Sequence, residues 1–269
     1  MARISMNEMT TYRWTFEEDV VNYAACGFSA LSVWRQKLSD FGEERGEDLL
    51  AEHRMKVASV LWAGGFTGMD GRSYRESVDD ARDGLRLAAD LNAESLVIYS
   101  GSRAGHTYNH ARRILRAALG ELCPLAEDLG VDLALEPMHV NCAGEWTFLT
   151  SLSDAASLLA ELDCPRLRLL FDTYHFGHDP GLLEKLEELA PRIALVHLGD
   201  GKAPPGDEQN RCRLGQGSIP LQAIVDALRR GGYDGYYDVE LIGEEIESSD
   251  YRDLLTQSRR SAEELLQQR

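Results

Sequence analysis

The feature of this sequence that most restricts its fold is an alternation, repeated eight times, between a short β-rich apolar segment and a longer segment of helical period. This alternation is typical of βα units, which pair their strands in parallel. Eight such units close into a barrel, and 269 residues are close to the length that such a barrel needs. The sequence therefore predicts an α/β protein, a single (β/α)8 TIM barrel, with residues 1–269 as one domain. The expected strands are Arg3–Glu8, Ala30–Trp34, Lys56–Trp62, Ser95–Tyr99, Asp132–Glu136, Arg168–Asp172, Ile193–Leu198 and Gly235–Leu241.

Local helix signals agree with this pattern. Thr15 and Glu18 have the spacing of a capping box, the segment 154–162 begins behind Ser153 and Asp154, and Pro220 opens a helix at its first turn. The polar segment 249–269 carries regularly spaced leucines, which predicts a last helix packed outside the barrel. No linker or low-complexity tract interrupts the chain.

Charge and composition exclude several functional classes. The chain has 28 Lys and Arg against 45 Asp and Glu, a net charge of −17, which repels polyphosphates and argues against nucleic-acid binding. No apolar run approaches the length of a membrane span and no signal segment is visible, so we expect a cytoplasmic protein. The five cysteines are scattered without a CxxC pair, so neither a disulfide framework nor a zinc knuckle is expected.

The candidate chemistry lies at the ends of four consecutive predicted strands. An apolar run leads into Glu136 in the fifth strand, Asp172 in the sixth, His197 in the seventh and Glu240 in the eighth. Catalytic groups of a βα barrel lie at the carboxyl ends of its strands, so these four side chains are expected to share one mouth. A single acidic residue at a strand end is often only a helix cap, but four in succession favour a functional site.

A divalent cation is the economical explanation of this group. Three carboxylates in one pocket would repel each other and take up protons, whereas a cation keeps them ionised and also binds the imidazole. Oxygen-rich ligation with one nitrogen favours Mn²⁺ first, with Mg²⁺, Co²⁺ or zinc as the other candidates. We therefore expect one divalent metal ion held by Glu136, Asp172, His197 and Glu240.

Several motifs resemble one known family along nearly the whole chain: Leu135-Glu136-Pro137, Phe171-Asp172-Thr173-Tyr174-His175, Val196-His197-Leu198-Gly199-Asp200, the segment 211–220 and Asp238-Val239-Glu240. In their order and spacing they are similar to the xylose isomerase-like barrel superfamily of sugar isomerases and epimerases. The resemblance implies that His175 and Arg211 contact substrate oxygens. It also implies that Glu136 and Glu240 serve as the acid and base as well as metal ligands.

The resemblance implies proton transfer next to the carbonyl of a keto-sugar or cyclitol, through an enediolate that the metal stabilises. Return of the proton to the neighbouring carbon gives an isomerase, and return to the other face of the same carbon gives an epimerase. Loss of a β-hydroxyl would give a dehydratase of an inosose-like substrate. We prefer isomerase or epimerase, and keep the dehydratase and a non-catalytic sugar-binding barrel as alternatives.

Positions at which this sequence departs from the family reduce the number of candidate functions. The endonuclease branch carries a His where Tyr99 and Ser100 stand and an Asp-x-His pair where this chain has residues 210–212, so a DNA-repair role is disfavoured. Ketose 3-epimerases have an acidic residue where Cys142 stands, which puts a simple assignment to that group in doubt. Trp146 is a candidate for stacking on a sugar face, with an ordinary loop residue as the other interpretation.

Two questions stay open at this point. Arg211, Arg213 and the Gly215-Gln216-Gly217 turn could form an anion site for a phosphorylated or carboxylated substrate, or the glycines could simply be required by a turn. Association into a homo-oligomer through the outer helices is plausible, but no sequence feature identifies an interface.

Overall fold

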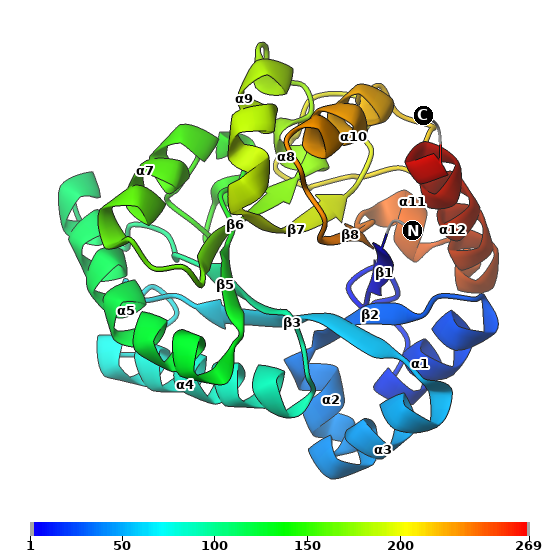
Figure 1. The fold of residues 1–269 in the computed structure, drawn as a ribbon, viewed down its shortest axis with the longest axis horizontal. Coiled ribbons are helices and arrows are strands. Elements are labelled where there is room, and N and C mark those ends of the chain that lie inside the picture. The colour runs from blue at the N-terminus through cyan, green and yellow to red at the C-terminus, as the bar shows by residue number, and fades with distance from the viewer. Residues whose placement is uncertain (1–2, 268–269) are drawn as a thin grey trace.

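The computed structural model describes residues 3–267, which form a closed barrel of eight parallel strands encircled by helices (Figure 1). Each strand pairs with its successor in the chain, and β1 pairs with β8 to complete the ring. The predicted TIM barrel is therefore confirmed. The strands are β1 Arg3–Asn7, β2 Ala30–Trp34, β3 Lys56–Gly64, β4 Ser95–Tyr99, β5 Asp132–Leu135, β6 Leu167–Asp172, β7 Ile193–Leu198 and β8 Tyr236–Val239.

All eight predicted strands exist, with ends that differ from the prediction by two residues or fewer. The fifth and eighth strands end at Leu135 and Val239, so Glu136 and Glu240 each occupy the first position after a strand. The backbone N–H groups of both glutamates still donate to the neighbouring strand, Glu136 to Ile98 and Glu240 to Leu198. The backbone of both residues therefore continues the strand, and their side chains follow the alternation of the strand.

The helices surround the barrel on its outside (Figure 1). They are α1 Phe16–Ala25, α2 Arg35–Phe41, α3 Glu43–His53, α4 Tyr74–Asp90, α5 Tyr108–Leu129, α6 Val140–Ala143, α7 Leu152–Leu162, α8 Thr173–Phe176, α9 Leu182–Leu189, α10 Leu221–Arg230, α11 Glu244–Glu247 and α12 Tyr251–Gln267, with a 3-10 turn at Ala190–Arg192. Within the described residues, no helix is both long and apolar enough to cross a membrane.

The predicted helix starts are largely confirmed. Thr15 caps α1 in a complete capping box with Glu18, and Pro220 directly precedes α10. The start of α7 was predicted too late: Ser151, not Ser153 or Asp154, is its N-cap and accepts from the backbone N–H of Asp154. The last helix is present as α12, and residues 268 and 269 lie outside the described residues.

Two apolar clusters show which strand positions face the inside of the barrel. The larger cluster joins the strands to the helices and includes Leu169 and Phe171 of β6. The smaller one fills the barrel, with Leu170 of β6, Leu195 of β7 and Ala134 of β5 among its members. Successive side chains of a strand point to opposite faces, so residues two positions further along face inward as well. This alternation directs Asp172, His197 and Glu136 into the mouth above the inner cluster.

Candidate metal centre

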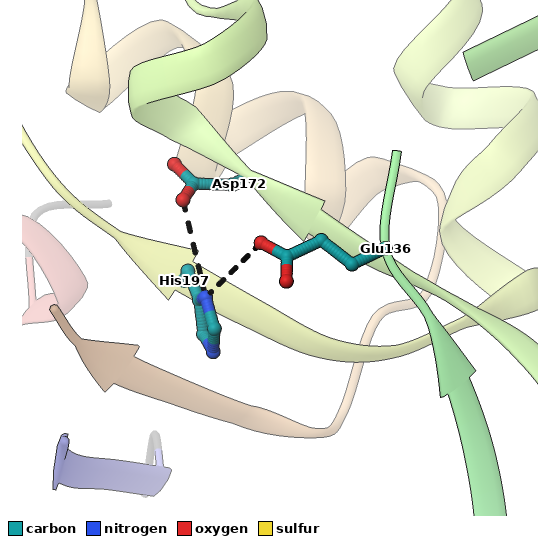
Figure 2. A group of neighbouring side chains, drawn as sticks. All are labelled: Glu136, Asp172 and His197. Carbon is teal, nitrogen blue, oxygen red and sulfur yellow. Dashed lines mark ion pairs between the residues drawn. The ribbon is translucent and has the colours of Figure 1, made fainter. Parts of the chain in front are cut away.

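Three of the four predicted metal ligands converge at the mouth of the barrel (Figure 2). Glu136, Asp172 and His197 each offer a ligand atom, and these atoms all lie within 4.8 Å of one another. His197 Nδ1 is the meeting point, 3.7 Å from Glu136 Oε1 and 3.9 Å from Asp172 Oδ2. Asp172 and His197 are register partners in the β6–β7 pairing, which brings their side chains together. All three residues are buried.

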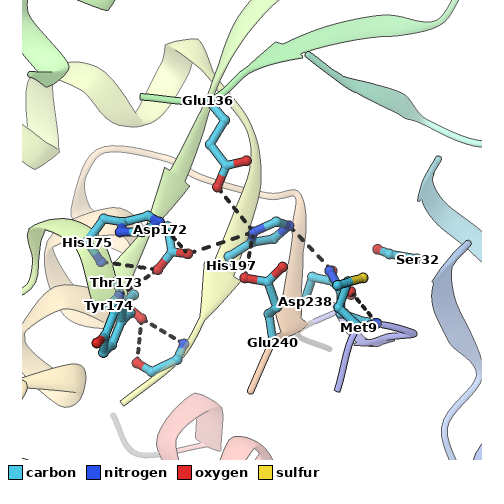
Figure 3. Close-up of polar contacts among 12 residues, drawn as sticks. Met9, Ser32, Glu136, Asp172, Thr173, Tyr174, His175, His197, Asp238 and Glu240 are labelled. Carbon is cyan, nitrogen blue, oxygen red and sulfur yellow. Dashed lines mark hydrogen bonds and ion pairs between the residues drawn. The ribbon is translucent and has the colours of Figure 1, made fainter. Parts of the chain in front are cut away.

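The fourth predicted ligand, Glu240, approaches the same nitrogen from β8 (Figure 3). Its Oε2 lies 3.4 Å from His197 Nδ1. Arg211 lies beside it and donates hydrogen bonds to Glu240 Oε2 and, over 2.8 Å, to Asp172 Oδ2. The buried guanidinium thus balances two of the three carboxylates and holds Glu240 at the edge of the cluster.

Burial and mutual repulsion strongly shift the titration of this cluster. Burial raises the pKa of Glu136 to about 8, and the charges of Glu240 and Asp172 act in the same direction. Burial alone would lower the pKa of His197, but the surrounding carboxylates, Glu240 first, raise it to about 10. The pKa of Glu240 falls far below its usual range, because the attraction of Arg211 and His197 exceeds the cost of burial. The cluster is therefore a strong attractor for positive charge.

The imidazole is oriented so that one nitrogen is free to bind a cation. Within residues 3–267, neither ring nitrogen of His197 has a hydrogen-bond partner, although both are buried. Nδ1 faces the carboxylates, whereas Nε2 faces Asp238 Oδ2 at 3.7 Å. A ligating histidine commonly has a carboxylate behind its other nitrogen, which fixes the ring. An unpartnered imidazole nitrogen facing three carboxylates is a donor set that suits a divalent ion.

The three predicted substrate contacts line the cavity that contains this cluster. His175, Arg211 and Trp146 are among its wall residues, together with Glu136, His197 and Glu240. His175 is buried, and its Nδ1 has no hydrogen-bond partner among the described residues. Burial lowers the pKa of His175 to about 4, so the ring is neutral and can accept or donate a hydrogen bond. The structure thus brings together all seven predicted site residues, whose roles remain predictions.

The anion site considered in the 211–217 segment is already filled by the protein itself. The N–H groups of Gly215 and Gly217 both donate to Asp200 Oδ2 over 2.9 Å. Arg213 points away from the cavity and pairs with Asp253 of α12 at 2.8 Å. The carboxylate of Asp200 therefore accepts the hydrogen bonds that a bound phosphate would accept. The glycine turn has a structural role.

Sequence reasoning missed two residues that matter here. Asp238 lies behind His197, and Trp62 at the end of β3 forms part of the cavity wall. The signal for Asp238 was present, because Asp238 and Glu240 are two positions apart and face the same side of the strand. The rule that catalytic groups lie at strand ends selects only the last polar residue of each strand, and it does not select aromatic residues.

Comparisons with known proteins agree with the fold. Over 240 residues the chain is 26% identical to a ketose 3-epimerase of Arthrobacter globiformis, which covers 82% of this chain and 78% of that protein. It is 23% identical over 251 residues to an inosose isomerase of Bacillus velezensis, covering 89% and 88%. An uncharacterised protein of Methanocaldococcus jannaschii, MJ1311, is 26% identical over 178 residues, 64% of this chain and only 59% of that protein.

Solved structures show the same architecture. The protein SMc04130 of Sinorhizobium meliloti 1021 superposes with a TM-score of 0.90 at 24% identity, covering 97% of this chain and 98% of that one. The IolI protein with a bound zinc atom superposes with a TM-score of 0.86 at 18% identity, covering 98% of each chain. The sequence model of one family matches residues 20–266, and this chain belongs to that family, the xylose isomerase-like TIM barrels.

Proposed function

We propose that this protein is a divalent-metal-dependent isomerase or epimerase that moves a proton next to the carbonyl of a keto-sugar or cyclitol. The observation that carries the proposal is the convergence of Glu136, Asp172 and Glu240 on one nitrogen of His197. The names of the related ketose 3-epimerase and inosose isomerase support the same class of substrate. A dehydratase of a keto-cyclitol on the same site is the alternative.

Glu136, Asp172, His197 and Glu240 would hold the metal, with Mn²⁺ as our first expectation. The IolI structure, which has the same fold and contains a bound zinc atom, supports a divalent ion. A divalent ion in the site would polarise the substrate carbonyl and stabilise negative charge on its oxygen and on the neighbouring hydroxyl oxygen.

The proton is moved by the two glutamates. Glu136 follows β5 and Glu240 follows β8, and they approach the imidazole from different sides (Figure 3). One carboxylate accepts the proton from the carbon beside the carbonyl while the electron pair moves toward the carbonyl oxygen. The other carboxyl then returns a proton, either to the opposite face of the same carbon, which restores the carbonyl, or to the former carbonyl carbon, in which case the hydroxyl proton of the first carbon passes to the former carbonyl oxygen. The two outcomes correspond to an epimerase and an isomerase.

The remaining cavity residues bind and orient the sugar. His175 presents an unpartnered Nδ1 and suits a hydroxyl of the substrate. Arg211 can donate to a substrate oxygen, and it also holds Glu240 in place. Trp146, which is 39% exposed at the cavity wall, presents a ring on which the apolar face of a sugar can pack.

The first test is the metal content per chain, measured by elemental mass spectrometry after reconstitution with manganese and desalting. We expect about one ion per wild-type chain, from the single predicted cluster, and almost none in Asp172→Ala. The matched control is Asp179→Ala, an exposed aspartate in the loop before α9, which should retain the ion. Equal and negligible metal in all three proteins would refute the metal centre.

The second test is incorporation of solvent deuterium into recovered substrate by the metal-loaded protein. A panel of ketoses and inososes in D₂O should show exchange at the carbon beside the carbonyl with at least one member. The Glu240→Gln variant should lose this exchange, because an amide cannot accept the proton. Absence of label across the panel would instead favour a sugar-binding barrel without catalysis.

A further inference from the structure

We infer that the substrate site extends beyond the metal centre into a groove for a second, neutral hexose ring joined to the reacting keto-sugar. This inference rests on the proposed function for the identity of the reacting sugar. The groove is defined by a set of aromatic side chains, by their continuity with the metal cavity and by the pairing of the nearby charges.

Five aromatic rings form a continuous row along the mouth of the barrel, which we call the aromatic row: Tyr12, Trp34, Trp62, Trp146 and Tyr99. Neighbouring ring centroids are 5.9 Å apart from Tyr12 to Trp34 and 6.1 Å apart from Trp34 to Trp62, with interplanar angles of 28° and 12°. Trp146 meets Trp62 and Tyr99 edge-on, at 5.4 and 5.7 Å. These residues come from five different βα loops or strand ends, so only the closed barrel assembles them.

The aromatic row joins the metal cavity to a neighbouring groove. Trp62 and Leu61 line the cavity that contains Glu136 and His197. The same two residues also line a groove between α2 and residues 80–90 of α4, and Trp34 continues its wall. A ligand bound at the metal centre can therefore extend into the groove without leaving an aromatic surface. A single monosaccharide would occupy only the first of these two spaces.

The charges of the groove favour a neutral ligand. Its two arginines are already paired: Arg35 with Asp80 at 2.9 Å, and Arg86 with Asp83 at 2.7 Å. The wall also carries Glu43 and Asp90, so carboxylates outnumber arginines by four to two. A phosphate or carboxylate would be repelled there. Aromatic rings beside polar groups suit a sugar, which has an apolar face and a polar rim.

The backbone at Trp34, the tryptophan of the groove, is anchored to a buried carboxylate. The backbone N–H of Trp34 donates to the buried Glu8 Oε2 over 2.6 Å, and Lys37 Nζ lies 5.9 Å from the Trp34 ring centroid. Arg35 also donates to the carbonyl oxygen of Trp62. Because ordering a loose side chain costs free energy on binding, a pre-positioned tryptophan binds more strongly. This support is what a recognition surface requires.

Most of the exposed large apolar side chains also lie at the mouth of the barrel. Among the described residues, the exposed large apolar side chains are Tyr12 at 56%, Val21, Val140 and Trp146 at 39%. Three of these four lie in βα connections at the mouth, Tyr12 and Trp146 in loops and Val140 at the start of the short helix α6, whereas Val21 lies on the outer helix α1. Clustered exposed apolar side chains mark a binding surface. A second sugar ring along the aromatic row would cover part of this surface.

The test compares fructose with three disaccharides in which a hexose is linked to fructose: lactulose, maltulose and isomaltulose. Binding to the metal-loaded protein is measured by isothermal titration calorimetry, and turnover by deuterium incorporation. We expect at least one disaccharide to bind about tenfold more tightly than fructose, because a ring stacked on tryptophan contributes roughly this factor. Fructose 6-phosphate is expected to bind more weakly than fructose.

The Trp34→Ala variant should reduce the affinity ratio of disaccharide to fructose about tenfold, and Trp34→Phe should largely restore it. Trp14→Phe is the matched control, because Trp14 packs against Tyr251 away from the groove and should leave the ratio unchanged. Circular dichroism melts verify that each variant is folded. Equal binding of fructose and all disaccharides, or a ratio unaffected by Trp34→Ala, would overturn the groove. Absence of deuterium in every sugar, with Trp34-dependent binding intact, would instead overturn the proposed catalysis alone.

Discussion

His197 and Asp238 face each other across 3.7 Å, with the imidazole Nε2 directed at the carboxylate Oδ2. Asp238 is itself fixed, because it accepts hydrogen bonds from Ser5 over 2.6 Å and from Asn7 over 2.9 Å. The ring of His197 therefore lies between a carboxylate that orients it and three that surround its other nitrogen (Figure 3). This arrangement places Nδ1, not Nε2, on the ligand side.

We predict that Asp238→Asn lowers the affinity for Mn²⁺ by about 10- to 100-fold, the usual cost of losing a carboxylate behind a ligating histidine. Isothermal titration calorimetry with Mn²⁺ measures it directly. Asp234→Asn, an exposed aspartate four positions earlier, is the control and should bind like the wild type. Unchanged affinity in Asp238→Asn would mean that the ring is held by packing alone.

Metal binding should become stronger as the pH rises from 6 to 9. Without metal, burial raises the pKa of Glu136 to about 8, and the carboxylates raise that of His197 to about 10. Both groups therefore carry protons at neutral pH, and a cation must displace them in order to bind. Calorimetry at pH 7 in buffers of different ionisation enthalpy should reveal proton release. A constant affinity over this range, with no proton release, would contradict the shifted pKa values.

The fold was predictable because each strand is marked by a short apolar run, and the site because strand ends of a barrel share one mouth. The contacts of Asp200 are an example of what the sequence pattern could not predict. The glycine turn and Arg213 were visible as a local pattern, but their partners, Asp200 and Asp253, are distant along the chain and become neighbours only in the folded barrel. The aromatic row was missed for the same reason, since its rings come from five separate βα units.

Lys37 should be a key residue for stability. It is buried and donates to Asp19 Oδ2 over 2.6 Å and to the carbonyl oxygens of Glu8 and Thr11. Burial raises the pKa of Asp19 to about 6 and that of Glu8 well above its usual value, so Lys37 offsets an unfavourable pair of carboxylates. Lys37→Met should lower the free energy of unfolding by about 3–5 kcal/mol at pH 8, measured by urea denaturation.

The loss of unfolding free energy in Lys37→Met should depend on pH. An acid whose pKa is raised by folding binds more protons in the folded state, so stability falls as the pH rises from the unfolded pKa toward the folded one. The loss in Lys37→Met should therefore be smaller at pH 5, where Asp19 and Glu8 take up protons. Lys202→Met is the control, because its ion pair with Glu245 is 61% exposed on the lysine side and its loss should leave the free energy of unfolding nearly unchanged at both pH values. An equal loss at both pH values would show that packing, not charge, is responsible.

Asp200 offers the last prediction, because one buried carboxylate organises the whole turn that follows β7. Its oxygens accept from the backbone N–H groups of Gly201, Gly215 and Gly217, with a weaker contact to Ile219. Asp200→Ala would leave these donors without an acceptor, and each buried unpaired donor costs about 1–3 kcal/mol. The same turn leads from Arg211, so its loosening should also weaken the hold on Glu240.

We therefore expect Asp200→Ala to unfold at a clearly lower urea concentration than the wild type. Asp207→Ala, an exposed aspartate in the same loop, is the matched control and should unfold like the wild type. Addition of inorganic phosphate separates the two interpretations of the turn. If Asp200 merely replaces an anion, phosphate should rescue the stability of Asp200→Ala. If the carboxylate is an integral part of the fold, phosphate should have no effect on the stability of Asp200→Ala. The burial of Asp200 and its covalent place in the main chain favour this outcome.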